Sequence, residues 1–323
     1  MTQIDGLLPG EFPPSNNISR FFTPDHKSAY DQVYQAAKTE NDETKSRNLR
    51  VLGFLILFAP RPDSTALVEI VIAVKSTALR DLHVLGQIYS DCFVRPCSRT
   101  PFTPSRPSRP FFDARAQEIK ATITEAPKNH SDAKDKALVR DGYQCVVTRM
   151  IDPKCTSFFD AAQRKTFGTE SALFGLDKEL KKEYSASILA VLDRFGIKSD
   201  DLNGEKIHGL WNVMTLALQI HDSFDKLEVR LEATKKEHEY ISPIEVHGPM
   251  KLTSSDPNVP LPNPKLLEFH AAVCKIAHLS GAAEHIENVM RDYERIGVLA
   301  EDGRSMAVLE QALLRAGSDR IGT

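Results

Sequence analysis

A proline-rich basic segment, residues 96–110, divides the sequence into two parts. It reads PCSRTPFTPSRPSRP, with five prolines, three arginines and no acidic residue. Proline removes a backbone donor and the segment offers little apolar surface, so we predict an extended linker rather than part of a packed core. Contact of its arginines with phosphates is the alternative. We predict a poorly ordered N-terminus (1–25), a helical or mixed region (26–95), this linker and a larger domain (111–323).

Charge and hydropathy exclude two classes of protein. A formal net charge of −3 does not favour a chain that coats nucleic acid through bulk charge, so nucleic-acid binding would need a local basic surface. The longest apolar run, residues 51–59, is too short for a membrane span of about 20 residues. The N-terminus shows no secretory signal. We therefore expect an intracellular protein, cytoplasmic or nuclear, with no membrane partner.

Cysteine usage agrees with a reducing compartment. The five cysteines include no CxxC pair and predict reduced thiols rather than a disulfide framework. Cys145 and Cys155 are ten residues apart and leave a zinc site open as an alternative to two buried thiols.

Hydrophobic spacing gives a mainly helical prediction. Residues 50–59 and 68–74 are consistent with either a buried strand or a helix. Short strands are expected at 143–148, 226–232 and 241–246. We expect Ser131 as a helix N-cap, and Pro260, Pro262 and Pro264 mark a loop. Helices are predicted over 25–40, 78–95, 113–125, 131–140, 184–195, 212–220, 266–277, 282–293 and 306–316.

Two motifs carry the chemical information. Asn212 precedes His221 by nine residues across an apolar run, and Phe224-Asp225 follows. Upstream, the second motif covers residues 137–148 and contains Arg140-Asp141-Gly142-Tyr143. In isolation, an asparagine and a histidine beside an apolar helix are a cap and a satisfied polar contact more often than a site. Their combination with the upstream motif favours an inherited scaffold.

The combined pattern resembles the HNH nuclease domain proteins of mushroom-forming fungi. The similarity covers most of residues 45–320. Beyond the two motifs it includes the Pro/Ser linker and the segments 51–54 (VLGF), 125–127 (EAP), 261–264 (LPNP) and 277–284 (AHLSGAAE).

The resemblance implies an α+β fold, with a helical envelope around a degenerate ββα-metal core. In that family a divalent metal ion (Mg, Mn or Zn) stabilises the scissile phosphate, and a histidine on the first strand acts as general base. Asn212 matches the orienting asparagine and His221 the metal-binding histidine. Asp225 is a second candidate metal ligand, with the capping of a following strand as its alternative role. Asp222 could also add an oxygen.

The general base is the missing part. Aligned on the Glu170-Ser171 pair, Thr166 falls where the family has its histidine, and no histidine lies between His130 and His208. A threonine hydroxyl cannot act as a general base near neutral pH. Glu170 and His208 are the candidate replacements, against the simpler readings of a solvated carboxylate and a residue that caps the helix start.

Three functions follow as hypotheses. The first is a metal-dependent phosphodiesterase on nucleic acid with a replacement base. The second is a pseudo-nuclease that binds nucleic acid or protein without cleavage. The third is a scaffold repurposed for chemistry on a small molecule. The residues favour lost or weakened hydrolysis, and the sequence leaves the oligomeric state open.

Overall fold

A computed structural model describes residues 7–18, 23–60, 65–98, 117–118, 131–151, 167–168, 179–243 and 248–295. Within these ranges the fold is α+β, with helices in the majority and two small antiparallel sheets. None of the helices that the structure describes combines the length and the apolar character needed to cross a membrane.

The two N-terminal helices both begin at a side-chain cap. In α1 (Pro24–Thr39), the Thr23 side chain accepts a hydrogen bond from the His26 backbone N–H at 3.2 Å. In α2 (Glu43–Phe58), Asp42 accepts from the Lys45 backbone N–H at 3.0 Å. Residues 47–58 of α2 are all buried, because α1, α4 and α9 pack against this helix. The apolar run at 50–59 is therefore helical.

The segment that follows α2 is helical but irregular. The β-branched residues 68–74 lie within α3 (Thr65–Ser76). The predicted helix at 78–95 is confirmed in its centre and interrupted at both ends. A 3-10 turn η3 (Leu79–Asp81) precedes α4 (Leu82–Tyr89), and a π-helical turn η4 (Ser90–Val94) and a 3-10 turn η5 (Arg95–Cys97) follow it. Leu79 is 52% exposed because it lies in η3, outside the packed face of α4.

Four further predicted helices are found, whereas the one predicted over 212–220 is not. They are α6 (Ser131–Arg140), α7 (Glu179–Arg194), α9 (Pro264–Ser280) and α10 (Ala282–Arg295). Ser131 is the first residue of α6. Gly196 after α7 and Gly281 after α9 both have φ of 78°, the left-handed conformation that ends helices. The helix predicted at 306–316, and all of 113–125 except 117–118, lie outside the described residues.

The strands are shorter than predicted. β3 (Glu232–Ala233), β4 (Glu239–Ile241) and β5 (Met250–Lys251) form one antiparallel sheet, with Ala233 opposite Tyr240 and Tyr240 opposite Met250. The strand predicted at 226–232 is wrong except for its last residue. Residues 226–229 close the preceding helix instead, with the Val229 N–H bonded to the Ser223 carbonyl. The partner strand lies at 239–241, at the start of the predicted 241–246.

The strand predicted at 143–148 is also wrong. Tyr143 and Arg149 have φ of 56° and 60°, so the chain turns sharply at both positions. Within the turn, the Cys145 N–H donates to the Met150 carbonyl and the Arg149 N–H to the Cys145 carbonyl. A single bridge between Gln144 and Ile151 remains of the expected strand pairing.

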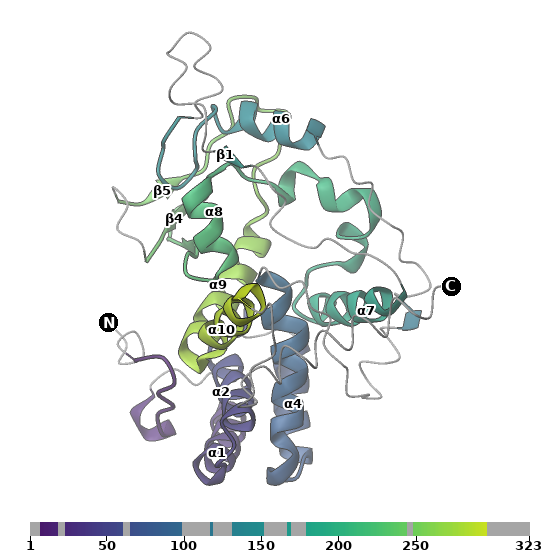
Figure 1. The fold of residues 1–323 in the computed structure, drawn as a ribbon, viewed down its shortest axis with the longest axis vertical. Coiled ribbons are helices and arrows are strands. Elements are labelled where there is room, and N and C mark those ends of the chain that lie inside the picture. Colours follow the sequence, from purple (N-terminus) through teal and green to yellow (C-terminus); the bar gives the residue numbers. More distant parts are fainter. Residues whose placement is uncertain are drawn as a thin grey trace.

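Two hydrophobic cores lie one above the other (Figure 1). The larger core, in the lower half of the view, joins α1, α2, α3, α4 and η4 to α7 and to one side of α9. The smaller core lies among residues 145–147, 214–217, 224–231 and the β3–β5 sheet, in the upper half. Helix α9 contributes Phe269 to the larger core and Leu267 to the smaller one, so it forms the floor between them.

Candidate functional site

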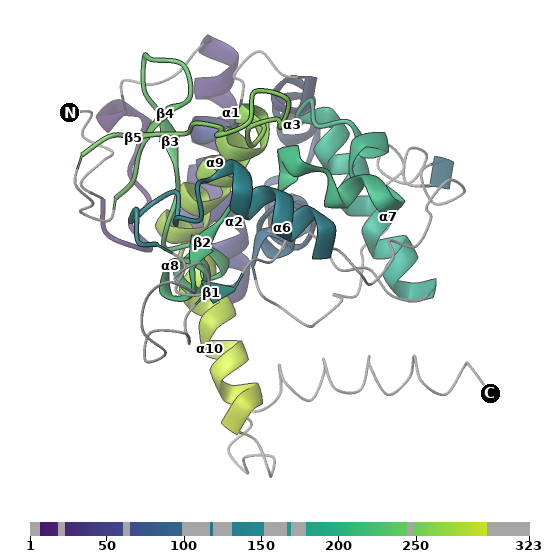
Figure 2. The same cartoon turned by 90° about the horizontal axis from the view of Figure 1, so that it is seen from above.

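A strand–strand–helix unit occupies the upper half of the molecule. β1 (Phe167–Gly168) and β2 (Leu216–Ala217) are antiparallel, with Phe167 opposite Ala217, and α8 (Leu218–Asp225) follows β2 directly. Helix α8 packs against both strands. Figure 2 shows β1, β2 and α8 grouped together, just above the label of α10 in that view. Strands that lie 48 residues apart in the sequence are therefore brought to one helix.

Helix α8 brings two of the predicted site residues together. His221 Nδ1 lies 3.6 Å from Asp225 Oδ2, and the two residues are one helical turn apart. Their side chains are 11% and 19% exposed, so the pair is mostly shielded from bulk solvent. Because Asp225 ends α8 and faces His221, and the next strand begins at Glu232, it does not cap that strand. Asp222 instead bonds Lys226 at 2.8 Å, away from this pair.

Asn212 does not lie on the helix predicted over 212–220. It ends a 3-10 turn, η10 (Leu210–Asn212), residues 213–215 have no regular secondary structure, and only then do β2 and α8 follow. Its buried side chain donates from Nδ2 to the Ile207 carbonyl at 2.9 Å. Asn212 therefore fixes the backbone before β2 to the preceding 3-10 turn, η9 (Gly204–His208).

The reason for this departure from a helix is a buried ion pair at Arg140 and Asp141. Arg140 donates to both carboxylate oxygens of Asp141, at 2.7 and 2.9 Å, and to the carbonyls of Leu210 and Val213, each at 2.7 Å. Asp141 in turn accepts from the Thr215 N–H at 2.9 Å. The backbone of 210–215 thus satisfies its polar groups through α6 rather than through a helix of its own. We call this arrangement the Arg140–Asp141 clamp. It fixes the backbone that leads into β2 and α8.

Of the two candidate replacement bases, the structure describes only His208. His208 ends η9 and is half-buried, and no three His, Cys, Asp or Glu side chains of the described ranges form a potential metal-binding group. Glu170 and the degenerate base position Thr166 lie outside the described residues, and Thr166 immediately precedes β1 in sequence.

The zinc alternative finds no support at Cys145. This thiol is completely buried beneath the turn at 145–150, where its sulfur accepts from the Thr148 N–H at 3.4 Å. It belongs to no metal-binding group among the described residues, and Cys155 lies outside them. Cys92, Cys97 and Cys274 are also buried and form no disulfide with one another or with Cys145.

Sequence reasoning missed His270, which supports α8 from below. Its ring stacks on Phe224 with centroids 3.6 Å apart and an interplanar angle of 4°. Burial lowers the pKa of His270 to about 3, against a smaller opposing effect of its hydrogen bond to the Phe224 backbone. The imidazole is therefore neutral at pH 7 and acts as a flat packing group. Its i,i+4 spacing to Cys274 on the buried side of α9 was the available signal.

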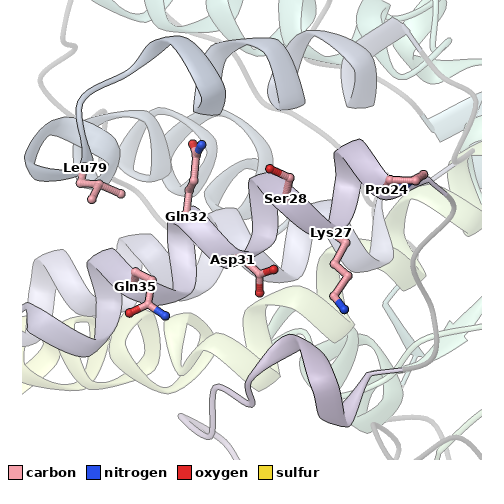
Figure 3. A pocket seen from close by; sticks show the side chains of 7 residues that line it. All are labelled: Pro24, Lys27, Ser28, Asp31, Gln32, Gln35 and Leu79. Atoms are coloured by element: carbon pink, nitrogen blue, oxygen red, sulfur yellow. The ribbon is translucent and has the colours of Figure 1, made fainter.

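Two hollows on the described surface are open to comparison with ligand sites. The one beside Asn212, between Trp211, Phe224, Pro262 and His270, has a volume of ≈ 30 Å³, room for about one water molecule. The larger one, ≈ 480 Å³, runs along α1 and ends at Leu79. Its polar side chains point to both sides of the helix and do not converge on a point (Figure 3). Neither hollow holds a set of groups suited to small-molecule chemistry.

Comparisons with protein-family models, curated proteins and solved structures find no match to this chain. The geometry of α8 and its surroundings is therefore the evidence that bears on function.

Proposed function

We propose that this chain is an HNH-related protein in which His221 and Asp225 hold a divalent cation against a nucleic-acid phosphate, with hydrolysis lost or strongly weakened. The observation that carries the proposal is the His221–Asp225 pair on a helix that follows a two-stranded antiparallel sheet. The order strand–strand–helix is the one that the family resemblance implies.

The donor set suits a divalent cation. An imidazole nitrogen and a carboxylate oxygen are ligands for Mn²⁺ and Zn²⁺, and a carboxylate is also a ligand for Mg²⁺. Bonds of about 2.0–2.2 Å from each ligand span roughly 4.2 Å. His221 Nδ1 and Asp225 Oδ2, 3.6 Å apart, can therefore reach one ion. When bound, the ion would neutralise charge on a phosphate, while the clamp and Asn212 keep α8 in place.

The weakened hydrolysis follows from the absent imidazole. The sequence has no histidine between His130 and His208, and Thr166 stands at the position before β1. Loss of a general base typically lowers the rate by roughly 10²–10⁴-fold. Binding of a phosphate to the cation does not need that base, so binding is expected to persist without efficient cleavage.

Metal binding is tested with Mn²⁺ by calorimetry. We expect His221→Ala and Asp225→Asn to lower the association constant at least about 10-fold, because each removes one of two protein ligands. Asp222→Asn is the matched control, since this carboxylate lies on the same helix and pairs with Lys226. Equal affinities for the Asp225 and Asp222 variants would refute the site.

Nucleic-acid function is tested with supercoiled plasmid in Mg²⁺, Mn²⁺ or Zn²⁺. We expect salt-dependent retention of the plasmid with little or no nicking, because phosphate contacts release counterions. Thr166→His restores the missing imidazole and is expected to raise metal-dependent nicking. If the wild-type protein nicks rapidly and His221→Ala nicks equally fast, cleavage does not proceed through this site and the proposal is wrong.

A further inference from the structure

Large apolar residues are exposed around the turn that follows α6, next to the α8 site. Half of the large apolar residues that are strongly exposed in the described part of the chain gather here, each between 39% and 56% exposed: Val139, Tyr143, Met150, Ile151 and Leu218. We call these five residues, with Arg149 among them, the turn surface. A gathering of exposed apolar residues on a protein surface marks a place where something binds.

Hydrogen bonds join this turn to the strand that leads into α8. The Tyr143 N–H donates to the Leu138 carbonyl in α6 at 2.7 Å, and the Val146 N–H donates to the Thr215 carbonyl at 2.9 Å. Leu218 follows Thr215 by three residues, which span at most about 11 Å. The exposed residues of the turn and the first turn of α8 therefore share the upper part of the molecule, where Figure 1 shows α6, β1 and α8.

The turn is firmly anchored although its ends are exposed. Cys145, Val146 and Val147 are at most 3% exposed and belong to the smaller core. Tyr143 and Arg149 have φ of 56° and 60°, an unfavourable conformation for side chains of this size that persists only where surrounding contacts impose it. The fold thus keeps a phenol ring and a guanidinium group at the surface.

The charges of the turn favour a partner that carries phosphate groups. Arg149 is exposed and donates to the carbonyl of Lys251, which is exposed as well. The one acidic residue of the segment 139–151 is Asp141, whose carboxylate is 2% exposed and paired with Arg140 in the clamp. Apolar and aromatic side chains beside exposed basic groups match the bases and the phosphates of a nucleic acid.

We propose that the turn surface binds unpaired bases of a single-stranded nucleic acid, with a phosphate of the same strand at the cation on α8. This inference rests on the proposed function for the phosphate and adds the class of nucleic acid. The faces of bases are open to side chains only where the bases are unpaired, because a duplex presents its phosphates and base edges. Leu218 and His221 are three residues apart on one side of α8, so bases and phosphate are neighbours.

Fluorescence anisotropy with the full chain in Mg²⁺ tests the class of nucleic acid. The probes are a labelled single strand of roughly 12 nucleotides and a duplex of the same sequence. We expect the single strand to bind at least about 10-fold more tightly than the duplex, because only the strand offers base faces. A strand of abasic sites keeps the phosphates and is expected to bind as weakly as the duplex. Equal affinities for the intact and the abasic strand would overturn the inference.

Variants of Tyr143 test the stacking itself. Tyr143→Ala is expected to lower the association constant for the intact strand by about 5- to 150-fold, the loss that follows from removal of one stacked base contact, and to leave binding of the abasic strand unchanged. Tyr143→Phe keeps the ring and should restore binding to within about 2-fold of the wild type. Ile72→Ala is the matched control, since Ile72 is 60% exposed on the distant helix α3. Equal strand affinities for Tyr143→Ala and Ile72→Ala would refute the surface.

Two further comparisons separate this inference from its neighbours. His221→Ala is expected to abolish the effect of Mg²⁺ on strand binding and to leave the effect of Tyr143→Ala intact. Loss of the Tyr143 effect with the Mg²⁺ effect intact refutes the turn surface alone, and the reverse refutes the cation site alone. Sedimentation velocity tests a second copy of the chain as the occupant. A wild-type dimer that Ile151→Ser converts to monomers, with no strand binding by either protein, would make the surface an interface between copies and overturn the inference.

Discussion

Arg140 Nε and Nη2 donate to Oδ1 and Oδ2 of the adjacent residue Asp141, at 2.7 and 2.9 Å, and the two side chains are 0% and 2% exposed. Two consecutive residues therefore form a bidentate pair while their remaining polar atoms hold the backbone of 210–215. These two neighbouring residues hold segments that are distant in sequence, because the carbonyl partners of Arg140 lie 70–120 residues further along the chain.

Asp141→Ala tests the clamp directly. It removes one member of a buried pair and leaves a buried guanidinium uncompensated, so the free energy of unfolding is expected to fall by about 3–5 kcal/mol. Urea unfolding measures this loss. Lys226→Met breaks the exposed pair with Asp222 and should change stability by less than about 1 kcal/mol. Similar losses for both variants would contradict a structural role of the clamp.

Asn212→Ala tests the link between η10 and η9. The variant leaves the buried Ile207 carbonyl without its donor at 2.9 Å, and we expect a loss of about 1–3 kcal/mol in the free energy of unfolding. Asn258→Ala, at an exposed position in a loop, should stay within about 0.5 kcal/mol of the wild type. A neutral Asn212→Ala would mean that the 3-10 turn holds without this side chain.

His270 predicts an acid-sensitive contact between α8 and α9. Its folded-state pKa of about 3 lies below the ordinary value near 6.5, so the unfolded chain binds a proton that the folded chain does not. Stability is therefore lost as the pH falls from about 6.5 toward 3, with this group contributing roughly 1.4 kcal/mol for each pH unit. His270→Leu removes that component. Urea unfolding of both proteins at pH 7, 5.5 and 4.5 measures the difference, which should shift steadily in favour of the variant on acidification.

Gly86→Ala tests the close approach of α4 to α2. A Cβ atom at this position would lie 2.0 Å from the Asn48 carbonyl oxygen, which is backbone and cannot rotate away. We expect the helices to be forced apart, at a cost of about 1–3 kcal/mol, and a lower Tm by calorimetry. Gly86→Val should lower the Tm further. An unchanged Tm in both variants would show that the helix pair adjusts freely.

Local signals were sufficient for the long helices. Thr23-Pro24 and Asn263-Pro264 each combine a capping side chain with a proline in the first turn, and α1 and α9 begin there. Gly281 ends α9 in the left-handed conformation. These features act within a few residues of the chain and are visible in the sequence, although we placed Pro264 in a loop and it is the first residue of α9.

The failures at 143–148 and 212–220 have a different origin. Both segments have the composition of regular elements, but their backbone groups bind partners remote in sequence, such as the Val146 N–H on the Thr215 carbonyl. The two-residue strands β1 and β2 are likewise too short to show a period. Tertiary contacts therefore determine the backbone conformation of these segments.

The candidate site could be predicted from the sequence only in part. His221 and Asp225 have the i,i+4 spacing that brings side chains together once the helix begins at Leu218 rather than Asn212. The packing role of His270 follows from its burial against α8, and its i,i+4 spacing to Cys274 does not show which element it contacts.

Helix α9 gives one face to each hydrophobic core, with Phe269 and Val273 on the larger side and Leu267 on the smaller. Removal of this helix would leave both hydrophobic cores exposed on the side that α9 covers. A truncation ahead of Pro264 would therefore strip both halves together, and heat should melt the intact protein in a single cooperative step rather than one half at a time.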